Sequence, residues 1–289
     1  MRVKCIARAG TWAMLLLLAA CGPEAETGAV FGKYHAPEAR KVGQSLNDTI
    51  VPPTLEDEQS TELASNSGAP VTQLPPETLH YLLGKFDPAR HPDFDALGKP
   101  YTDKTGMYLR RETLAAFKKM YAAAKQEGIV LKVISATRTF AQQKNIWDGK
   151  WTRFAAETPE PQARARRILE YSAMPGASRH HWGTDIDLND LNNASFEAGG
   201  RHEKAYAWLR AHAHEYGFCQ PYSARGTERP NGYNEEKWHW SYLPVATPLL
   251  RQYSQNVQDG MLSGFEGAAM ARHLSIVKHY VLGINPACQ

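Results

Sequence analysis

The ten residues SRHHWGTDID at positions 178–187 decide how this chain folds and what it can bind. They place the imidazole of His180 and the carboxylate of Asp187 seven residues apart, on either side of a glycine. From Asp185 to Leu188 polar and apolar side chains alternate, as in a half-buried strand, and the glycine before them is typical of a turn. Imidazole and carboxylate both suit zinc, so the stretch predicts a turn, a strand and part of a metal site.

A second segment, EKWHW at residues 236–240, supplies the remaining groups of such a site. It adds the imidazole of His239 with the carboxylate of Glu236 three residues before it, and residues 238–243 alternate loosely, as in a strand. A catalytic zinc site uses three protein ligands, an open position for water and a nearby base, and the two segments contain that inventory. A packed core histidine and an aspartate that caps a turn explain the same residues without a metal, so spacing alone leaves both interpretations open.

The rest of the pattern mixes helices and strands. Apolar residues at helical spacing predict one helix over residues 112–127 that ends at Gly128, and another over residues 203–216 that ends at Gly217. The β-branched run at residues 129–134 predicts a buried strand. Because these elements follow one another without a regular βαβ repeat, we expect an α+β fold rather than a doubly wound sheet.

Residues 1–20 have the form of an export signal. Three basic residues without an acid precede an apolar run of about ten residues, half of the roughly twenty that a membrane-spanning helix needs. The sequence LAAC at residues 18–21 resembles the bacterial lipobox, in which the cysteine is lipidated; an ordinary signal peptide with an incidental cysteine is the alternative. We therefore expect a lipid anchor at Cys21, and Gly22 resembles the sorting signal that leads to the periplasmic face of the outer membrane.

The chain after the signal divides into a tether and a domain. Residues 21–77 are rich in Glu, Ser, Thr, Pro and Ala without apolar periodicity, so we expect a flexible tether. Residues 78–289 are expected to form one compact domain with a C-terminal helical extension. Cys219 and Cys288 can form a disulfide in an oxidising exterior, tying that extension to the domain, and two free thiols are the alternative.

The composition excludes several classes of protein. A hydrophobic content of 43% excludes a wholly disordered chain. The 33 basic residues are interleaved with 30 acidic ones, for a net charge of +3, so no basic face for nucleic acid is evident. The four cysteines form no CxxC pairs, so any metal must be held mainly by histidine and carboxylate.

Three segments together resemble a known family of zinc peptidases. The first segment matches the pattern SxHxxGxxxD, the second matches ExxH, and SATRTFAQQ at residues 135–143 matches S-x-x-R-x-x-x-x-Q. In this order the patterns are those of the VanY-type D-alanyl-D-alanine carboxypeptidases, which are related to the D-Ala-D-Ala dipeptidases and the Hedgehog-type zinc fold. The resemblance covers about residues 79–242 and implies a small, mostly antiparallel sheet flanked by helices.

The resemblance also implies a role for each matched residue. His180, Asp187 and His239 would bind zinc, and Glu236 would act as general base and then as general acid. Arg138 would grip the substrate, because its planar fork of donors fits a terminal carboxylate or a developing oxyanion.

Other residues near the motifs are candidate substrate contacts. We expect Gln143 to orient Arg138 or bind peptide backbone, and Ser178 to hydrogen-bond the substrate. His181 is expected to face the substrate or support a ligand rather than bind metal. Asp185 stands where many relatives carry alanine, and three roles stay open for it: orienting a metal ligand, contacting a substrate amine, or facing solvent.

The expected activity is that of a monomeric D,D-carboxypeptidase that removes terminal D-Ala from peptidoglycan stem peptides with zinc-activated water. An L,D-carboxypeptidase or a peptidoglycan endopeptidase would use the same site. A non-catalytic cell-wall-binding lipoprotein that keeps zinc for structure is an alternative of another class, and Glu236 argues against it because such a protein needs no base.

Overall fold

A four-stranded antiparallel sheet organises residues 75–289, the part of the chain that this computed structural model describes. Its strands run in the order β3 (Val133–Ser135), β4 (Asp185–Leu188), β6 (His239–Tyr242) and β5 (Phe218–Cys219). The pairing of β4 with β6 places Asp187 opposite His239, so two segments more than fifty residues apart meet at the centre of the sheet. The expected signal peptide, Cys21 and the tether up to residue 74 lie outside the described residues.

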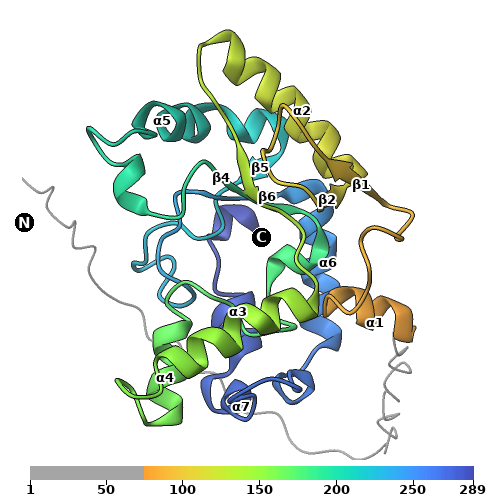
Figure 1. Cartoon of the computed structure of the whole chain (residues 1–289), viewed down its shortest axis with the longest axis vertical. Coiled ribbons are helices and arrows are strands. Elements are labelled where there is room, and N and C mark those ends of the chain that lie inside the picture. The colour runs from red at the N-terminus through yellow and green to blue at the C-terminus, as the bar shows by residue number, and fades with distance from the viewer. Residues whose placement is uncertain (1–74) are drawn as a thin grey trace, which may run out of the picture. The chain divides into compact units, whose positions relative to one another are not determined.

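Helices surround this sheet (Figure 1). A separate antiparallel hairpin, β1 with β2, precedes the first long helix. The bounds of these elements are α1 (Pro76–Leu82), β1 (Phe94–Leu97), β2 (Met107–Arg110), α2 (Arg111–Gln126), α3 (Phe140–Arg153), α4 (Pro161–Ile168), α5 (Glu203–His212), α6 (Leu243–Asn256) and α7 (Met270–Leu274). None of the described helices is long and apolar enough to cross a bilayer.

The two faces of β4 meet different surroundings. Successive side chains of a strand point to opposite faces, so Ile186 and Leu188 share one face while Asp185 and Asp187 share the other. The apolar face packs into a core with side chains of α2 and α5, which lie together at the top of Figure 1. The acidic face turns away from that core, and this places both carboxylates where the candidate site forms.

Most expected elements appear near their expected bounds, and the α+β class is confirmed. The helix expected over 112–127 is α2, and the helix expected over 203–216 is α5 continued by a 3-10 turn at Ala213–Tyr216. The buried strand expected over 129–134 is wrong in its first four residues, because the strand covers only Val133–Ser135. Residues 129–132 connect the end of α2 to the sheet, and within them Val130 is 64% exposed while Leu131 is buried in the core.

The C-terminal extension is helical and packs back onto the domain. After α6 and α7 come a π-helical turn at Val277–Val281 and a 3-10 turn at Pro286–Cys288. A disulfide joins Cys219 to Cys288, and the Asn285 N–H donates to the Pro221 carbonyl at 2.8 Å. The extension thereby holds the start of the 220–236 segment, which leads to Glu236.

Candidate active site

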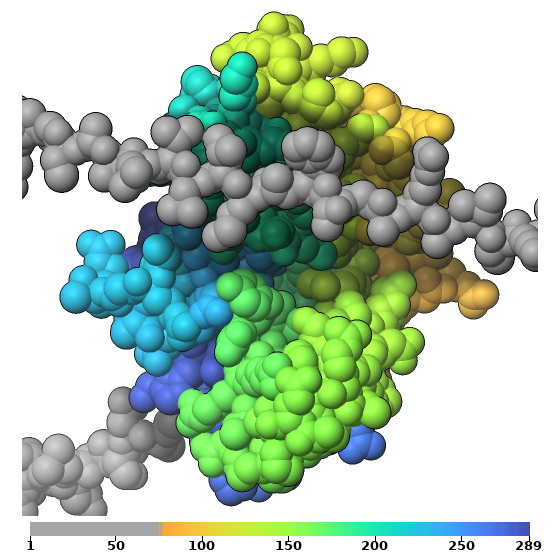
Figure 2. All heavy atoms as spheres, turned by 60° about the vertical axis from the view of Figure 1, so that its left-hand side comes forward, coloured from red at the N-terminus to blue at the C-terminus, as the bar shows by residue number. Residues whose placement is uncertain are grey.

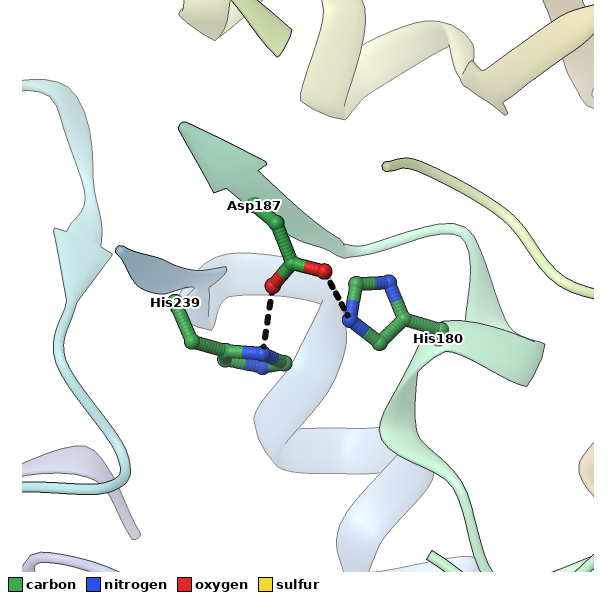
Figure 3. A group of neighbouring side chains, drawn as sticks. All are labelled: His180, Asp187 and His239. Atoms are coloured by element: carbon green, nitrogen blue, oxygen red, sulfur yellow. Dashed lines mark ion pairs between the residues drawn. The ribbon is translucent and has the colours of Figure 1, made fainter. Parts of the chain in front are cut away.

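Three buried side chains converge at the centre of the sheet (Figure 3). Asp187 comes from β4, His239 from β6 and His180 from the 3-10 turn at Arg179–Trp182. One Asp187 carboxylate oxygen lies 3.0 Å from His239 Nδ1 and the other lies 3.3 Å from His180 Nε2. One ligand atom of each residue lies within 4.8 Å of the others, so the three can share one metal ion.

Hydrogen bonds on the far side of each imidazole fix which nitrogen faces Asp187. His180 Nδ1 lies 2.8 Å from the Ala136 carbonyl, to which it can only donate, so Nε2 keeps its lone pair. His239 Nε2 lies 2.9 Å from Asp185 Oδ1 and donates to that carboxylate, which leaves Nδ1 directed at Asp187. Metal-binding histidines are oriented in this way in other proteins, by a carboxylate or a carbonyl behind the ring.

The atoms that face the centre fit a metal ion. His180 Nε2 and one Asp187 oxygen are buried and have no hydrogen-bond partner within the described part of the chain. Leaving buried polar atoms without a partner is costly, and a cation between them would satisfy both. Two imidazoles and one carboxylate form the donor set of a catalytic zinc site with a position left for water.

A buried ionic network supports His239 from behind. Asp185 is fully buried, and it accepts hydrogen bonds from Arg179 Nε at 3.1 Å and from the hydroxyls of Thr184 and Ser241. Burial opposes ionisation of Asp185, but the Arg179 guanidinium outweighs it and holds the pKa of the carboxyl below its usual range. Burial likewise opposes protonation of His239, yet the carboxylates of Asp185 and Asp187 on either side of its ring raise its pKa to about 9.

Glu236 lies beside the three candidate ligands without being one of them. Its backbone N–H donates to the Tyr222 carbonyl at 2.9 Å, and its Oε2 lies 3.5 Å from His239 Nδ1. Burial raises the pKa of Glu236 to about 8, although the charges of His239 and Arg138 oppose that shift. A carboxyl whose pKa lies near neutrality is suited to accept and return a proton.

Two connected hollows meet at this centre. The larger is a cleft of about 570 Å³, and the smaller is a pocket of about 30 Å³. Arg138, Glu236, Tyr171 and Ser172 line both of them. The remaining lining residues of the cleft are Ile146, Lys150, Asp187, Leu191, Asn192, Asn193 and Trp238, and those of the pocket are Gln143, Ala173, Ser178, His180, Tyr222, Tyr233 and His239.

The pocket contains polar atoms that the protein does not use. Arg138 Nε, Gln143 Oε1 and Tyr233 Oη are buried without a hydrogen-bond partner among residues 75–289. Gln143 is held by its other end, because its Nε2 donates to the Ala173 carbonyl at 2.8 Å. A capping box between Thr139 and Gln142 starts α3 directly after Arg138, which places Arg138 and Gln143 at the same end of the helix.

Sequence reasoning missed Tyr222 and Tyr233. They belong to the 220–236 segment, whose surface lies beside that of α3 and α4 in Figure 2, and Asn234 N–H donates to the Glu170 carbonyl at 2.8 Å. The segment has no helical or alternating pattern that could have marked them. Gly232 is required there, since its φ is +90° and a Cβ would lie 2.1 Å from the Gly283 carbonyl oxygen.

The structure places two further candidate residues, His181 and Asp185, outside the lining of both hollows. His181 is buried away from both hollows: Nδ1 donates to the Arg138 carbonyl at 2.7 Å, and Nε2 accepts from the Gly176 N–H at 3.0 Å. Both ring nitrogens are therefore occupied by backbone, and burial lowers the pKa of His181 to about 3. Asp185 is fully enclosed behind His239, so of its three open roles the structure shows the contact with a candidate ligand.

Comparisons with known proteins find similarity to carboxypeptidases. Residues 106–245 match the family VanY, described as D-alanyl-D-alanine carboxypeptidase. Over 138 residues the chain is 31% identical to YodJ of Bacillus subtilis, covering 47% of this chain and 46% of that protein. It is 28% identical over 138 residues to a D-alanyl-D-alanine carboxypeptidase of Enterococcus faecalis, covering 46% of this chain and 48% of that protein.

The chain thus spans about half the length of these curated relatives. Among solved structures, a mutant of the vancomycin-resistance D,D-pentapeptidase VanY in complex with Zn(II) is similar with a TM-score of 0.40 and 25% identity. That similarity covers 54% of this chain and 88% of the other.

Proposed function

Residues 106–245 of this chain belong to the VanY family of D-alanyl-D-alanine carboxypeptidases, and we propose that the protein is a zinc-dependent carboxypeptidase that removes terminal D-Ala from peptidoglycan stem peptides. The observation that carries the proposal is the position of the small pocket. Its unused donors lie next to the candidate metal ligands and to Glu236.

The size and chemistry of the pocket favour removal of a terminal residue over cleavage within a chain. A volume of about 30 Å³ suits a small terminal group better than a continuing, cross-linked peptide. Arg138 and Tyr233 offer N–H and O–H donors there, which suit the free carboxylate at the end of a peptide. An endopeptidase substrate would bring no such charge to the pocket.

His180, Asp187 and His239 would hold the zinc ion. Bound there, zinc would supply a Lewis acid for the scissile carbonyl and would lower the pKa of a bound water to about 7. Glu236 then accepts the proton of the attacking water and returns it to the leaving amine. Arg138 and the pocket around it hold the terminal carboxylate, which fixes the scissile bond beside Glu236.

We further propose that the domain is exported and anchored by lipid at Cys21, on the periplasmic face of the outer membrane. The support is the lipobox-like LAAC sequence and the length of residues 21–77, which would give the domain reach above the membrane. Mass spectrometry of the membrane-extracted protein tests this, with a diacylglycerol-modified Cys21 at the mature N-terminus as the expected result. An unmodified N-terminus elsewhere contradicts it.

Product analysis tests the proposed activity. The purified protein is incubated with a pentapeptide, a tetrapeptide and a cross-linked muropeptide, with and without a metal chelator. Loss of one terminal D-Ala from the pentapeptide, abolished by chelator and restored by zinc, is the expected result. Cleavage of the tetrapeptide alone would indicate an L,D-carboxypeptidase, cleavage of the cross-link an endopeptidase, and no cleavage a non-catalytic protein.

A further inference from the structure

The cleft is lined by cations that form no ion pair within the described residues. Arg138 and Lys150 line the cleft, and Arg153 follows Lys150 by three residues on α3. None of the three forms an ion pair within residues 75–289, whereas Lys144 of the same helix pairs with Asp148. The hydrogen bond that Lys150 makes is to a neutral group, the Ser172 hydroxyl, at 2.5 Å.

The helix itself directs Lys150 into the cleft. Residues at i, i+3 and i+7 share one face of a helix, and Gln143, Ile146 and Lys150 follow that spacing along the walls of the two hollows. Lys150 and Arg153 lie in the last turn of α3, where a cation also complements the helix dipole. That effect is available to a fully exposed side chain, so it does not explain why Lys150 is half-buried.

The distance along α3 gives the span of a bound peptide. Gln143, in the small pocket, and Lys150 are seven residues apart, which is about 10 Å at roughly 1.5 Å per residue. An extended peptide covers the same length in about three residues at roughly 3.4 Å each. A peptide with its terminal residue in the pocket therefore passes Lys150 about three residues upstream.

Two exposed apolar side chains also line the cleft. Tyr171 and Leu191 are 46% and 58% exposed, and they are two of the four large hydrophobic side chains exposed in the described structure. Tyr171 packs near Trp238, with ring centroids 6.2 Å apart. Exposed apolar side chains beside an unneutralised cation suit an aliphatic chain that ends in an anionic group.

We propose that Lys150 binds a second free carboxylate of the substrate, upstream of the terminal residue that the small pocket holds. The inference rests on the proposed function and adds to it a substrate class, stem peptides with an acidic group two or three residues upstream of the terminal one. Two groups of a pentapeptide have this chemistry: the α-carboxylate of a γ-linked D-glutamate at the second position, three residues upstream, and a carboxylate at the end of a diamino acid side chain at the third, two residues upstream. The exposed Tyr171 and Leu191 favour the diamino acid, because its aliphatic side chain can contact them.

Three synthetic pentapeptides separate the two sources. The first contains D-glutamate and meso-diaminopimelate, the second replaces meso-diaminopimelate with L-lysine, which lacks only the side-chain carboxylate, and the third replaces D-glutamate with D-isoglutamine. We expect the kcat/KM of the native protein to fall about 10- to 100-fold for the second peptide, the range of a hydrogen bond to a charged group. A fall for the third peptide instead assigns the same role to the D-glutamate carboxylate.

Variants at position 150 test whether the Lys150 side chain causes the preference for a peptide with a second free carboxylate. The variant Lys150→Met should bring the ratio of kcat/KM between the first peptide and its uncharged counterpart close to one, whereas Lys150→Arg should keep a preference. Lys204→Met removes a lysine of α5 that does not line the cleft, and it should leave the native ratio unchanged. Equal kcat/KM values for all three peptides, or an undiminished ratio in Lys150→Met, overturn the inference.

The experiment distinguishes failure of the Lys150 inference from failure of the proposed function. Hydrolysis of all three peptides with no preference supports the carboxypeptidase and refutes the role of Lys150. If none is hydrolysed, the proposed function fails, and calorimetric binding of the first two peptides to Lys150→Met and to the native protein still decides whether Lys150 selects a carboxylate.

Discussion

Replacing Asp185 with asparagine removes one charge from the network behind His239 and changes the side-chain volume little. In the native protein the Asp185 carboxylate accepts hydrogen bonds from His239 Nε2 at 2.9 Å and from Arg179 Nε at 3.1 Å. Arg179 is 1% exposed and so cannot turn to solvent when its partner is neutralised. The substitution therefore affects both the orientation of a candidate ligand and the stability of the fold.

The two effects have separate magnitudes. Loss of a group that orients a metal ligand typically weakens metal binding about 10- to 100-fold, which corresponds to about 1.4–2.7 kcal/mol. Removing one partner of a buried ion pair costs about 3–5 kcal/mol, and the lower end applies because asparagine still accepts one hydrogen bond. At about 2–4 °C per kcal/mol for a domain of this size, the midpoint of thermal unfolding should fall by roughly 6–12 °C.

Zinc competition titration and thermal melting measure these two quantities. The double variant Arg179→Met with Asp185→Leu serves as the control, because it removes both charges and leaves no unpaired one. Its melting temperature should recover most of the loss, since apolar replacement of a buried pair is often neutral. Its zinc affinity should stay weak, because leucine at position 185 gives His239 Nε2 no acceptor; native zinc affinity in Asp185→Asn would refute the reasoning.

Other variants and conditions test the remaining parts of the site. Glu236→Ala should retain zinc by elemental analysis while hydrolysis falls about 10²- to 10⁴-fold, and undiminished turnover would remove its role as base. His239→Ala should lose both metal and activity, and a variant with stoichiometric zinc would contradict the ligand assignment. Because the pKa of His239 is raised to about 9, its imidazole is protonated at pH 7 in the metal-free protein, and zinc must displace that proton. Zinc affinity should therefore rise about tenfold per pH unit from pH 7 to pH 9, and calorimetry that shows no proton release would exclude this. The double variant Cys219→Ser with Cys288→Ser opens a link between residues 69 apart, which should cost about 4 kcal/mol and lower the melting temperature by roughly 8–16 °C; an unchanged melting curve would show that the extension is held without it.

The sequence predicts those parts of the fold that have a local signal. The helix at residues 112–127 and the strands around Asp187 and His239 follow from side-chain periodicity, and α2, β4 and β6 lie close to these positions. The β-branched run after Gly128 is misleading, because Val130 is exposed and pairing in the sheet begins only at Val133. Pairing with a neighbouring strand, which composition does not reveal, decides where β3 starts.

The sequence predicts the residues of the site that lie in short motifs. It does not predict those that reach the site from segments without a motif. His180, Asp187 and His239 meet as the motifs imply. Tyr222 and Tyr233 line the pocket from a segment that is held by contacts between residues far apart in the chain, with Asn285 of the C-terminal extension and with Glu170.

The hydrogen-bond network behind His239 could not be predicted from the sequence either. The Asp185 carboxylate accepts hydrogen bonds from Arg179 and Ser241, which lie in different segments of the chain and belong to no common sequence pattern. We expect from the sequence that His181 faces the substrate or supports a ligand, but the 3-10 turn directs its ring into contacts with the backbone of Arg138 and Gly176.

Anomalous diffraction from a crystal of the protein, recorded at the zinc absorption edge, tests the metal site most directly. A single strong peak about 2.0–2.2 Å from His180 Nε2, His239 Nδ1 and an Asp187 oxygen, with Glu236 beside it and outside that coordination distance, is the predicted result. A peak at another position, or none in protein purified with zinc, would contradict the account.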